Sequence, residues 1–474
     1  MNNGELREEY LNILNELNGD EEGRRAAWNR MSHGFAVWGG KPAAMSYIPH
    51  CLTLDTRAYV ARITERMCDI LMKIICRYRE YPEYREEFRF DERVRELVLI
   101  PDMFDCVLPV ARIDFIMDDD TKELHFCEFN TDSSSGMAEN VESKAAVTEG
   151  NAYGIFAKNH SLSDDEYYFY EGFVKKFTNI YERCCSDRLL KDNNVNDDAI
   201  RGNFRPRIAI AVLFDSPTPD AKEQESYIPL FNKYGYDCSV FDVREIEYND
   251  GVVYGRKALA GDSNVKIDCI WRFCIMVDLL VHWNEVGSFI QAIRENAVPF
   301  IGGFATQIVH DKQLFAILRR SATKEFLTEE ECDFIDRYVP YTAFLDDEST
   351  DIEEIKRNKD KYIIKPTDWY GSKNVIPGRQ CSKAEWENAI DACINEQSIS
   401  PYLVQEFNSP FKSLTVPLYG DEEDYISEPR EYGNLYGAYA FEGEFGGIYL
   451  RQGPYDVIGS AKKGIVAPVV WVNS

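Results

Sequence analysis

Two short segments, Arg112-Ile113-Asp114 and Glu128-Phe129-Asn130, decide how the fold of this chain is interpreted. In each, polar side chains alternate with apolar ones, which is the period of a β-strand with one apolar and one polar face. The polar run 118–122 between them suits a hairpin loop. If the strands pair, two carboxylates and an amide oxygen converge beside Arg112, and such hard oxygen ligands suit magnesium. Taken alone, the segments favour an ordinary hairpin whose charged face meets solvent.

Length and charge limit the class of protein. With 474 residues the chain is long enough for two or three structural units. Its formal net charge of −28 argues against nucleic acid or an anionic membrane as the main partner. An anionic nucleotide stays possible, because a local cluster of Lys and Arg can bind phosphate within an acidic protein.

Cysteine usage and the lack of long apolar runs predict a cytoplasmic protein. The 13 cysteines are odd in number, contain no C-x-x-C pair and include the adjacent Cys184 and Cys185, which is typical of reduced thiols. The segment 1–9 is polar and lacks the apolar core of a signal peptide. No apolar run approaches the roughly 20 residues that span a bilayer. We therefore expect no membrane partner; the oligomeric state is not readable.

Apolar periodicity divides the chain into four regions of a mixed α/β fold. Residues 1–97 are predicted to be helical, with a long apolar stripe from Tyr59 to Tyr78. Residues 98–205 carry the acidic β segment, then a helix over about 164–184 and a polar linker. Residues 206–320 alternate strands with helices, among them one over about 281–296, which predicts a parallel α/β sheet. Residues 321–474 are mixed, with strands at 361–365 and 402–407 and a β-rich tail.

Several familiar motifs are absent. There is no Walker A sequence, no G-x-G-x-x-G, no H-x-x-x-H and no G-x-S-x-G. A P-loop ATPase, a zinc hydrolase and an α/β-hydrolase are therefore disfavoured.

Three weaker signals point to a nucleotide. Lys365 ends an apolar strand and precedes a small-residue turn that includes Gly371, Ser372 and Lys373, which suits phosphate binding. The strand 402–407 ends in Gln405-Glu406, which could face an adenine edge. Lys312 stands at the start of a predicted helix, where the helix dipole disfavours a cation. Singly, each signal is explained as well by a surface lysine or a plain strand end.

In combination, these residues resemble the nucleotide site of ATP-grasp enzymes. An R-x-D…E-x-N segment that precedes the α/β region and the phosphate lysines most closely resembles the glutathionylspermidine synthetase-like branch, whose strand order is permuted. The resemblance covers about residues 98–474 and implies an ATP-grasp fold, a parallel α/β pre-ATP-grasp domain at 206–320, and an ATP-binding lid, hinge and C-terminal β region at 321–474. No amidase domain of the bifunctional enzymes of that branch is present.

The resemblance also implies roles for individual residues. The implied magnesium ligands, for two ions, are Asp114, Glu128 and Asn130, and Arg112 is the residue that stabilises charge during transfer. The implied ATP contacts are Lys312, Lys365, Gly371, Ser372, Lys373, Gln405, Glu406 and Phe407. Ser133, Ser134 and Arg451 are possible substrate contacts, although Gln452-Gly453 departs from the acidic continuation usual after that arginine.

The implied function is an ATP-dependent carboxylate–amine ligase that forms an amide or peptide bond through an acyl phosphate. Its substrates would be a small-molecule carboxylate and an amine, with ATP and Mg²⁺ as cofactors. Two alternatives stay open: a non-catalytic Mg-ATP-binding regulatory or scaffold protein, and a small-molecule kinase. The identities of the acid and the amine are not readable from these residues.

Overall fold

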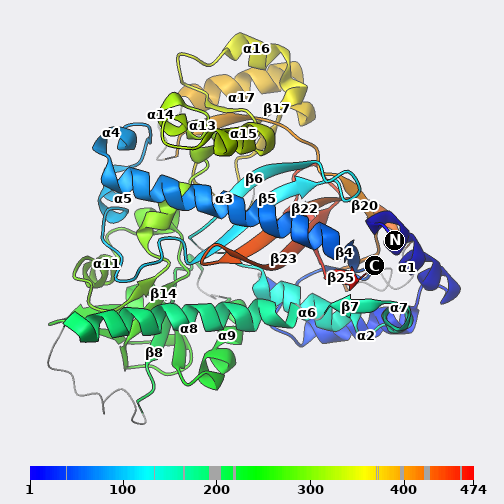
Figure 1. The fold of residues 1–474 in the computed structure, drawn as a ribbon, viewed down its shortest axis with the longest axis horizontal. Coiled ribbons are helices and arrows are strands. Elements are labelled where there is room, and N and C mark those ends of the chain that lie inside the picture. Colours follow the sequence, from blue (N-terminus) through cyan, green and yellow to red (C-terminus); the bar gives the residue numbers. More distant parts are fainter. Residues whose placement is uncertain are drawn as a thin grey trace.

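A central mixed sheet built from both ends of the sequence organises the molecule (Figure 1). The computed structural model describes all residues except 39, 133, 164–165, 192–203, 217–219, 370, 372, 396–399, 421–427, 460–461 and 474. The central sheet runs in the order β21 (Pro417–Leu418), β3 (Met45–Ser46), β24 (Ile465–Ala467), β23 (Glu444–Gly453), β22 (Arg430–Phe441), β5 (Val110–Met117) and β6 (Leu124–Asn130), and β20 (Lys412–Thr415) also pairs with β22.

The predicted hairpin is confirmed and lies inside this sheet. Antiparallel β5 and β6 place Asp114 opposite Glu128 and Arg112 opposite Asn130. On its other side β5 pairs antiparallel with β22, which places Gly437 opposite Asp114. The early acidic strands and the C-terminal β segment therefore form one continuous surface.

Long helices cover both faces of the central sheet. Helix α3 (Leu54–Glu80) begins at Thr53, whose hydroxyl accepts from Thr56 N, and its predicted apolar stripe packs on one face (Figure 1). On the opposite face, Tyr439 and Phe441 of β22 share a core with α6 (Met137–Val147) and α8 (Glu166–Lys191). Burial on both faces explains why the central strands contain few polar residues apart from those near the hairpin.

The predicted parallel sheet is confirmed for residues 207–301. Its order is β12 (Ala258–Ala260), β9 (Asp237–Asp242), β8 (Arg207–Val212), β14 (Cys269–Arg272) and β15 (Phe300–Ile301), and β12 alone is antiparallel. Helix α9 (Lys222–Lys233) lies between β8 and β9, within the predicted alternation of strands and helices. A three-stranded sheet, which was not predicted, adds β10 (Ile246–Asn249), β11 (Val252–Gly255) and β13 (Val265–Ile267).

The single helix predicted over 281–296 is wrong. The segment forms two short helices, α10 (Met276–Val281) and α11 (Gly287–Arg294). Between them the chain turns, with Glu285 N donating to the carbonyl of His282 and the His282 ring 3.0 Å from the Glu285 carboxylate. Of the predicted range, only Val281 and Gly287–Arg294 are therefore helical, although the apolar spacing continues.

A small four-stranded sheet stands apart from the central sheet, at the top of Figure 1. Its order is β16 (Thr342–Phe344), β19 (Tyr402–Glu406), β17 (Tyr362–Pro366) and β18 (Ile376–Pro377). Helices α16 (Ile352–Arg357) and α17 (Lys383–Asn395) cover one face, and the buried Trp386 lies in their common core. The other face is left to the cleft described below.

The remaining elements are mostly short. The helix predicted to begin near Lys312 is one turn only, because the segment 304–318 breaks into successive turns. The remaining α-helices and β-strands of the molecule are α1 (Asn3–Glu16), α2 (Glu21–Ser32), α4 (Pro82–Arg85), α5 (Glu92–Leu97), α7 (Asn151–Asn159), α12 (Gln307–His310), α13 (Leu314–Ile317), α14 (Ser321–Lys324), α15 (Glu329–Tyr338), β1 (Val37–Trp38), β2 (Lys41–Pro42), β4 (His50–Thr53), β7 (Ser161–Ser163) and β25 (Val469–Asn473).

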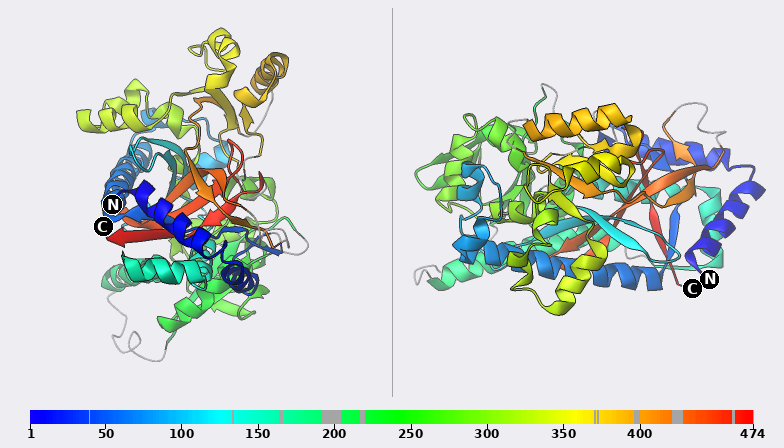
Figure 2. Two further views of the ribbon diagram at one scale, coloured as in Figure 1. Left: turned by 90° about the vertical axis from the view of Figure 1, so that its right-hand side faces the viewer. Right: turned by 90° about the horizontal axis from the view of Figure 1, so that it is seen from above.

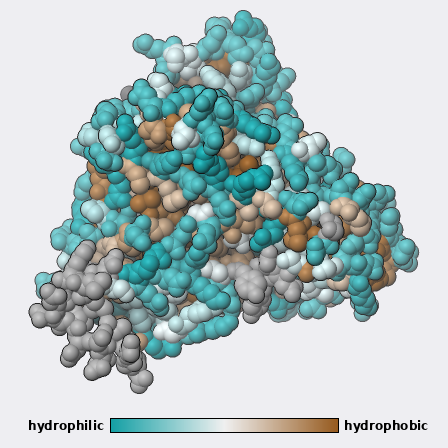
Figure 3. Space-filling view, in the orientation of Figure 1, coloured by the Kyte–Doolittle hydropathy of each residue, from teal (hydrophilic) through white to brown (hydrophobic). Residues whose placement is uncertain are grey.

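The surface agrees with the acidic, polar composition. The face shown in Figure 3 is mainly hydrophilic, with scattered apolar side chains. Within the portion of the chain that the structure describes, no helix has the length and apolar character needed to cross a bilayer.

The two termini lie near one another, as Figures 1 and 2 show, and β25 pairs in parallel with β4.

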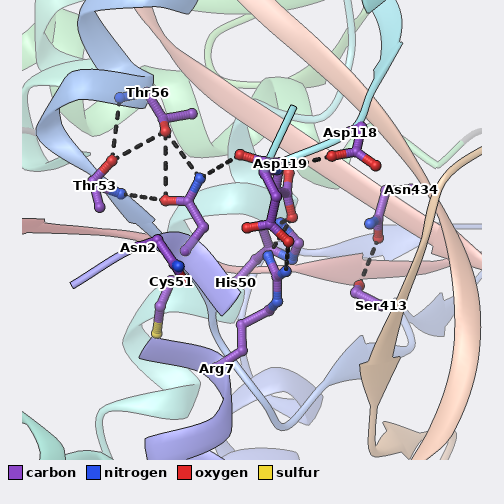
Figure 4. Close-up of polar contacts among 12 residues, drawn as sticks. Asn2, Arg7, His50, Cys51, Thr53, Thr56, Asp118, Asp119, Ser413 and Asn434 are labelled. Atoms are coloured by element: carbon purple, nitrogen blue, oxygen red, sulfur yellow. Dashed lines mark hydrogen bonds and ion pairs between the residues drawn. The ribbon is translucent and has the colours of Figure 1, made fainter. Parts of the chain in front are cut away.

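The N-terminal helix is fastened to the β5–β6 loop by a buried polar network (Figure 4). Asn3 donates to the Asp119 carbonyl at 2.7 Å, and Arg7 pairs with the Asp119 carboxylate. The same carboxylate lies 2.9 Å from His50 Nε2 and accepts from Tyr436 of β22. Asp119 therefore joins the first helix to the central sheet.

We expect Asp119→Ala to lower the free energy of unfolding by about 3–5 kcal/mol, because it leaves buried cationic and hydroxyl partners without their acceptor. Asp120→Ala is the matched control. Asp120 is 3.7 Å from Arg7 with a largely exposed side chain, so its loss should cost less than about 0.5 kcal/mol. Urea titration measures both values, and equal losses in the two variants would contradict this account of the network.

Candidate functional site

A cleft of about 840 Å³, counting its open mouth, lies between the central sheet and the four-stranded sheet. The strands β5, β6 and β22 line one wall, and β17 and β19 line the other. Apolar side chains on both walls could hold a flat ring: Ile116, Phe126, Ile363, Leu435, Val457 and Ile458. Of the residues implied to bind ATP or metal, the cleft is lined by Glu128, Lys312, Lys365, Gly371, Gln405, Glu406 and Phe407.

Lys365 is held by a chain of hydrogen bonds. Its Nζ donates to Gln405 Oε1 at 2.7 Å, and Gln405 Nε2 donates to Thr342 Oγ1 at 3.0 Å. The Thr342 hydroxyl in turn donates to the Pro340 carbonyl at 3.1 Å, which fixes the orientation of the Gln405 amide. Burial lowers the pKa of Lys365. The lysine thus lies in the cleft and forms no ion pair with a carboxylate of the described residues.

Lys312 bridges the two walls. Its Nζ lies 3.0 Å from Glu128 Oε1 on β6 and donates to the Trp369 carbonyl at 2.8 Å, while its backbone N–H donates to the Thr367 carbonyl. Burial would raise the pKa of Glu128, but the ammonium of Lys312 outweighs it and lowers the pKa to about 2. The pair is therefore ionised throughout the physiological range.

Two arginines neutralise Asp114. Arg112 contacts both Asp114 oxygens, at 2.8 and 3.2 Å, and donates to the Ser135 carbonyl. Arg451, which reaches from β23 across β22, pairs with the same carboxylate. The crossing requires Gly437, because a Cβ there would lie 2.8 Å from Arg112 Cδ and 3.0 Å from Asp114 Oδ1. Arg451, the weakest of the sequence-based assignments, is thus joined directly to the implied metal ligands.

The atoms of the implied metal ligands suit a hard cation, but the negative charges of their carboxylates are already paired with basic side chains. Asp114, Glu128 and Asn130 share one face of the hairpin. The buried Asn130 Nδ2 lacks a hydrogen-bond partner among the described residues, so this N–H group is available to donate to a ligand, whereas a metal would need the amide oxygen. Both carboxylates, however, are paired with basic side chains. Within the described residues no group of three or more His, Cys, Asp or Glu is arranged to hold a metal.

In the predicted adenine-binding hinge, only some of the polar groups are available to a nucleotide base. The Gln405 amide is used by Lys365 and Thr342, so it does not project freely into the cleft. The backbone N–H of Glu406 donates to the Tyr341 carbonyl at 2.8 Å, and that of Phe407 to the Lys361 carbonyl at 2.7 Å. The exposed Glu406 carboxylate remains available at the cleft wall. A donor on the ligand would therefore be matched better than an acceptor at this wall.

The other implied contacts are less central. Ser133 and Ser372 lie outside the described residues. Ser134 is buried, and its hydroxyl donates to the Asn130 carbonyl at 2.7 Å, so it holds the loop after β6. Lys373 is exposed, does not line the cleft and lies 5.7 Å from the ring centroid of Trp369.

Sequence reasoning missed a buried charged network behind Lys312, made of Asp132, Arg272, Gln307, His310 and Asp368. Burial, together with the nearby Asp311 carboxylate, raises the pKa of Asp368 to about 7. The available signal was polar residues within otherwise apolar stretches. His310 and Asp311 precede Lys312, and Asp132 follows Asn130 by two positions, but spacing does not reveal that they meet.

Solved structures confirm the fold at the coarse level. The chain is similar to a glutathione synthetase-like effector from Globodera pallida, in apoform, with a TM-score of 0.53 and 10% identity over 100% of this chain and 98% of that one. A more distant likeness, with a TM-score of 0.38, 9% identity and coverage of 84% and 83%, is to a protein assigned as a gamma-glutamylcysteine synthetase from Methylobacillus flagellatus KT. No protein-family model and no curated protein matches the sequence.

The first of these likenesses shows a mixed α/β fold similar to that of the glutathione synthetase-like effector. Identity this low carries no information about activity. The narrower assignment to the glutathionylspermidine synthetase-like branch stays a prediction.

We expect Asp368→Asn to stabilise the protein more at pH 8 than at pH 5. Because the folded state raises the pKa of this carboxyl from 3.8 to about 7, the wild type loses stability as the pH rises from about 4 to about 7 and then levels off. Asparagine does not ionise, so the variant should gain about 2 kcal/mol on the wild type between the two pH values. Urea titration at each pH measures this, and a pH-independent difference would refute it.

Proposed function

We propose that this protein is an ATP-dependent carboxylate–amine ligase that forms an amide or peptide bond through an acyl phosphate. The observation that carries the proposal is the convergence of Lys312, Lys365 and Glu128 in one cleft, although they come from three distant segments of the chain. The glutathione synthetase-like fold supports ATP use by this cleft.

The chemistry accounts for the basic residues. A substrate carboxylate oxygen attacks the γ-phosphorus of ATP, the bond to the β-phosphate oxygen breaks, and ADP leaves. An amine then attacks the acyl carbon, phosphate departs with the oxygen between carbon and phosphorus, and the amine loses a proton. Phosphoryl transfer is catalysed mainly by positioning and charge neutralisation. In a protein of net charge −28, that positive potential has to be local.

Within this proposal Lys312 and Lys365 contact the phosphates, and Arg112 with Arg451 covers charge that develops during transfer. Arg112, Arg451 and Lys312 are paired with Asp114 and Glu128, so these cations already lie where phosphate charge would have to be neutralised. A polyphosphate can replace a carboxylate as the partner of Lys312 or Arg451. Gly371 borders the cleft, where exclusion of water would protect a hydrolysable intermediate.

Asp114, Glu128 and Asn130 would hold magnesium once the basic side chains that now pair with the carboxylates pair with phosphate instead. When bound, it would neutralise phosphate charge. The shared face of Asp114, Glu128 and Asn130 supports this assignment. The permuted order, with the acidic hairpin ahead of the lysines, supports the glutathionylspermidine synthetase-like branch within this proposal.

A non-catalytic nucleotide-binding protein is the second candidate. The full pairing of both carboxylates with Arg and Lys favours it, because such a face can bind ATP without a metal-dependent step. A kinase for a small molecule is the third. Release of ADP distinguishes a ligase from the non-catalytic nucleotide-binding protein. Trapping of an acyl phosphate with hydroxylamine distinguishes a ligase from the kinase.

We expect Lys365→Met to weaken ATP binding at least about tenfold and to abolish ADP formation. Because burial already lowers the pKa of Lys365, the variant without ligand should be at least as stable as the wild type. Lys361→Met, on an exposed lysine just before β17, is the matched control and should change neither property. Calorimetric titration with Mg-ATP and thermal melting test this. Equal binding by the two variants would sink the assignment.

Glu128→Gln should retain the fold and lose ADP formation, because the amide is isosteric but cannot neutralise a cation as the carboxylate does. The substrates for this assay come from an ADP-release screen over pooled small acids, peptides and polyamines, with product masses determined. Full ADP formation by Glu128→Gln would remove this residue from the proposed site. ATP binding by the wild type without ADP release for any pair would favour the non-catalytic candidate.

A further inference from the structure

A buried polar network joins the two sheets that line the cleft to the parallel sheet of residues 207–301. His310 Nδ1 lies 3.0 Å from Asp132 Oδ1, and His310 Nε2 lies 3.7 Å from Asp368 Oδ1. Asp132 is also 3.8 Å from Arg272, which belongs to β14 of the parallel sheet. Gln307 Nε2 donates to Asp368 Oδ2 at 2.9 Å. All five side chains are buried.

Each carboxylate beside His310 belongs to a segment that carries a site residue. Asp132 follows β6, the strand of Glu128. Asp368 follows β17, the strand of Lys365. His310 ends α12 and contacts both of these segments, one after a strand of the central sheet and one after a strand of the four-stranded sheet.

The same arrangement determines where Lys312 lies. Two residues after His310, the Lys312 backbone N–H donates to the Thr367 carbonyl and its ammonium donates to the Trp369 carbonyl, both at 2.8 Å. Thr367 and Trp369 flank Asp368. The segment 367–369 is thus gripped on one side by Lys312 and on the other by His310 and Gln307, so a shift of His310 would move both lysines relative to Glu128.

Stability alone does not explain this network. Buried charges of this kind are commonly no more stabilising than an apolar packing of the same volume. Moreover, Gln307 Oε1 is buried and has no hydrogen-bond partner among the described residues. A half-satisfied buried network is costly and is typically retained for a purpose other than stability.

We propose that His310 is a positioning residue that bridges Asp132 and Asp368 and thereby sets the spacing of Lys312 and Lys365 from Glu128 across the cleft. This inference rests on the proposed function, because it assumes that these lysines bind the phosphates of a nucleotide. His310 does not itself line the cleft; it acts through the segments on either side of it.

Three substitutions separate positioning from simple structural support. His310→Asn keeps a polar atom near Nδ1, on the Asp132 side, and His310→Gln keeps one near Nε2, on the Asp368 side. His310→Ala loses both. The control is His125→Ala, a partly exposed histidine of β6 whose ring is 3.2 Å from Glu123.

The readouts are the Kd for Mg-ATP, the rate of ADP formation and the thermal midpoint without ligand. We expect His310→Ala to lower the rate about a hundredfold through misplacement of the lysines, with Asn and Gln intermediate and His125→Ala unchanged. The rate losses should not follow the thermal midpoints of the four variants.

Unchanged binding and rate in His310→Ala would overturn the inference, as would losses that simply track thermal stability. A wild type that binds no nucleotide would overturn the proposed function, and the inference with it. That outcome is distinguishable, because it is seen before any variant is made. A wild type that binds Mg-ATP while His310→Ala binds it equally well refutes the positioning role alone.

Discussion

The antiparallel pairing of β5 with β22 is the interaction on which the rest of the structure depends. It joins an acidic hairpin from the first third of the chain to strands near its C-terminal end. Gly437 makes the junction possible, because only a residue without a Cβ lets Arg112 and Arg451 meet on Asp114 across β22. This pairing places Glu128, on β6, in the same sheet as the C-terminal strands.

The second main feature of the cleft is the set of basic side chains at and beside it. The chain is strongly acidic, yet Lys312, Arg112 and Arg451 gather around two carboxylates, and Lys365 has a neutral amide as its partner. Ion pairs of this kind are costly to desolvate and are kept where their partners can be exchanged. Lys312 and Lys365 bring their positive charge into the cleft between the central sheet and the four-stranded sheet.

Much of the fold was predictable from local pattern, and the site only in part. The stripe along α3 and the alternation after Pro206 have strong periods, and both predictions are confirmed. The single helix predicted over 281–296 was wrong because the chain turns at 282–285, and apolar spacing does not reveal this turn. Lys312, Lys365 and Glu128 were identified through a motif combination. The roles of Thr342, Gly437 and His310 depend on contacts between distant segments, which no local pattern encodes.

The most direct test of the central claim is a crystal structure of the protein grown with Mg²⁺ and a non-hydrolysable ATP analogue. We expect the adenine base of the analogue to lie between the apolar walls of the cleft, near Ile116, Leu435 and Ile458. Its phosphate oxygens should lie within hydrogen-bond distance of Lys312 and Lys365. We also expect the pair between Lys312 and Glu128 to open. An analogue bound elsewhere, or an empty cleft at saturating analogue, would contradict the claim that this cleft is a nucleotide site.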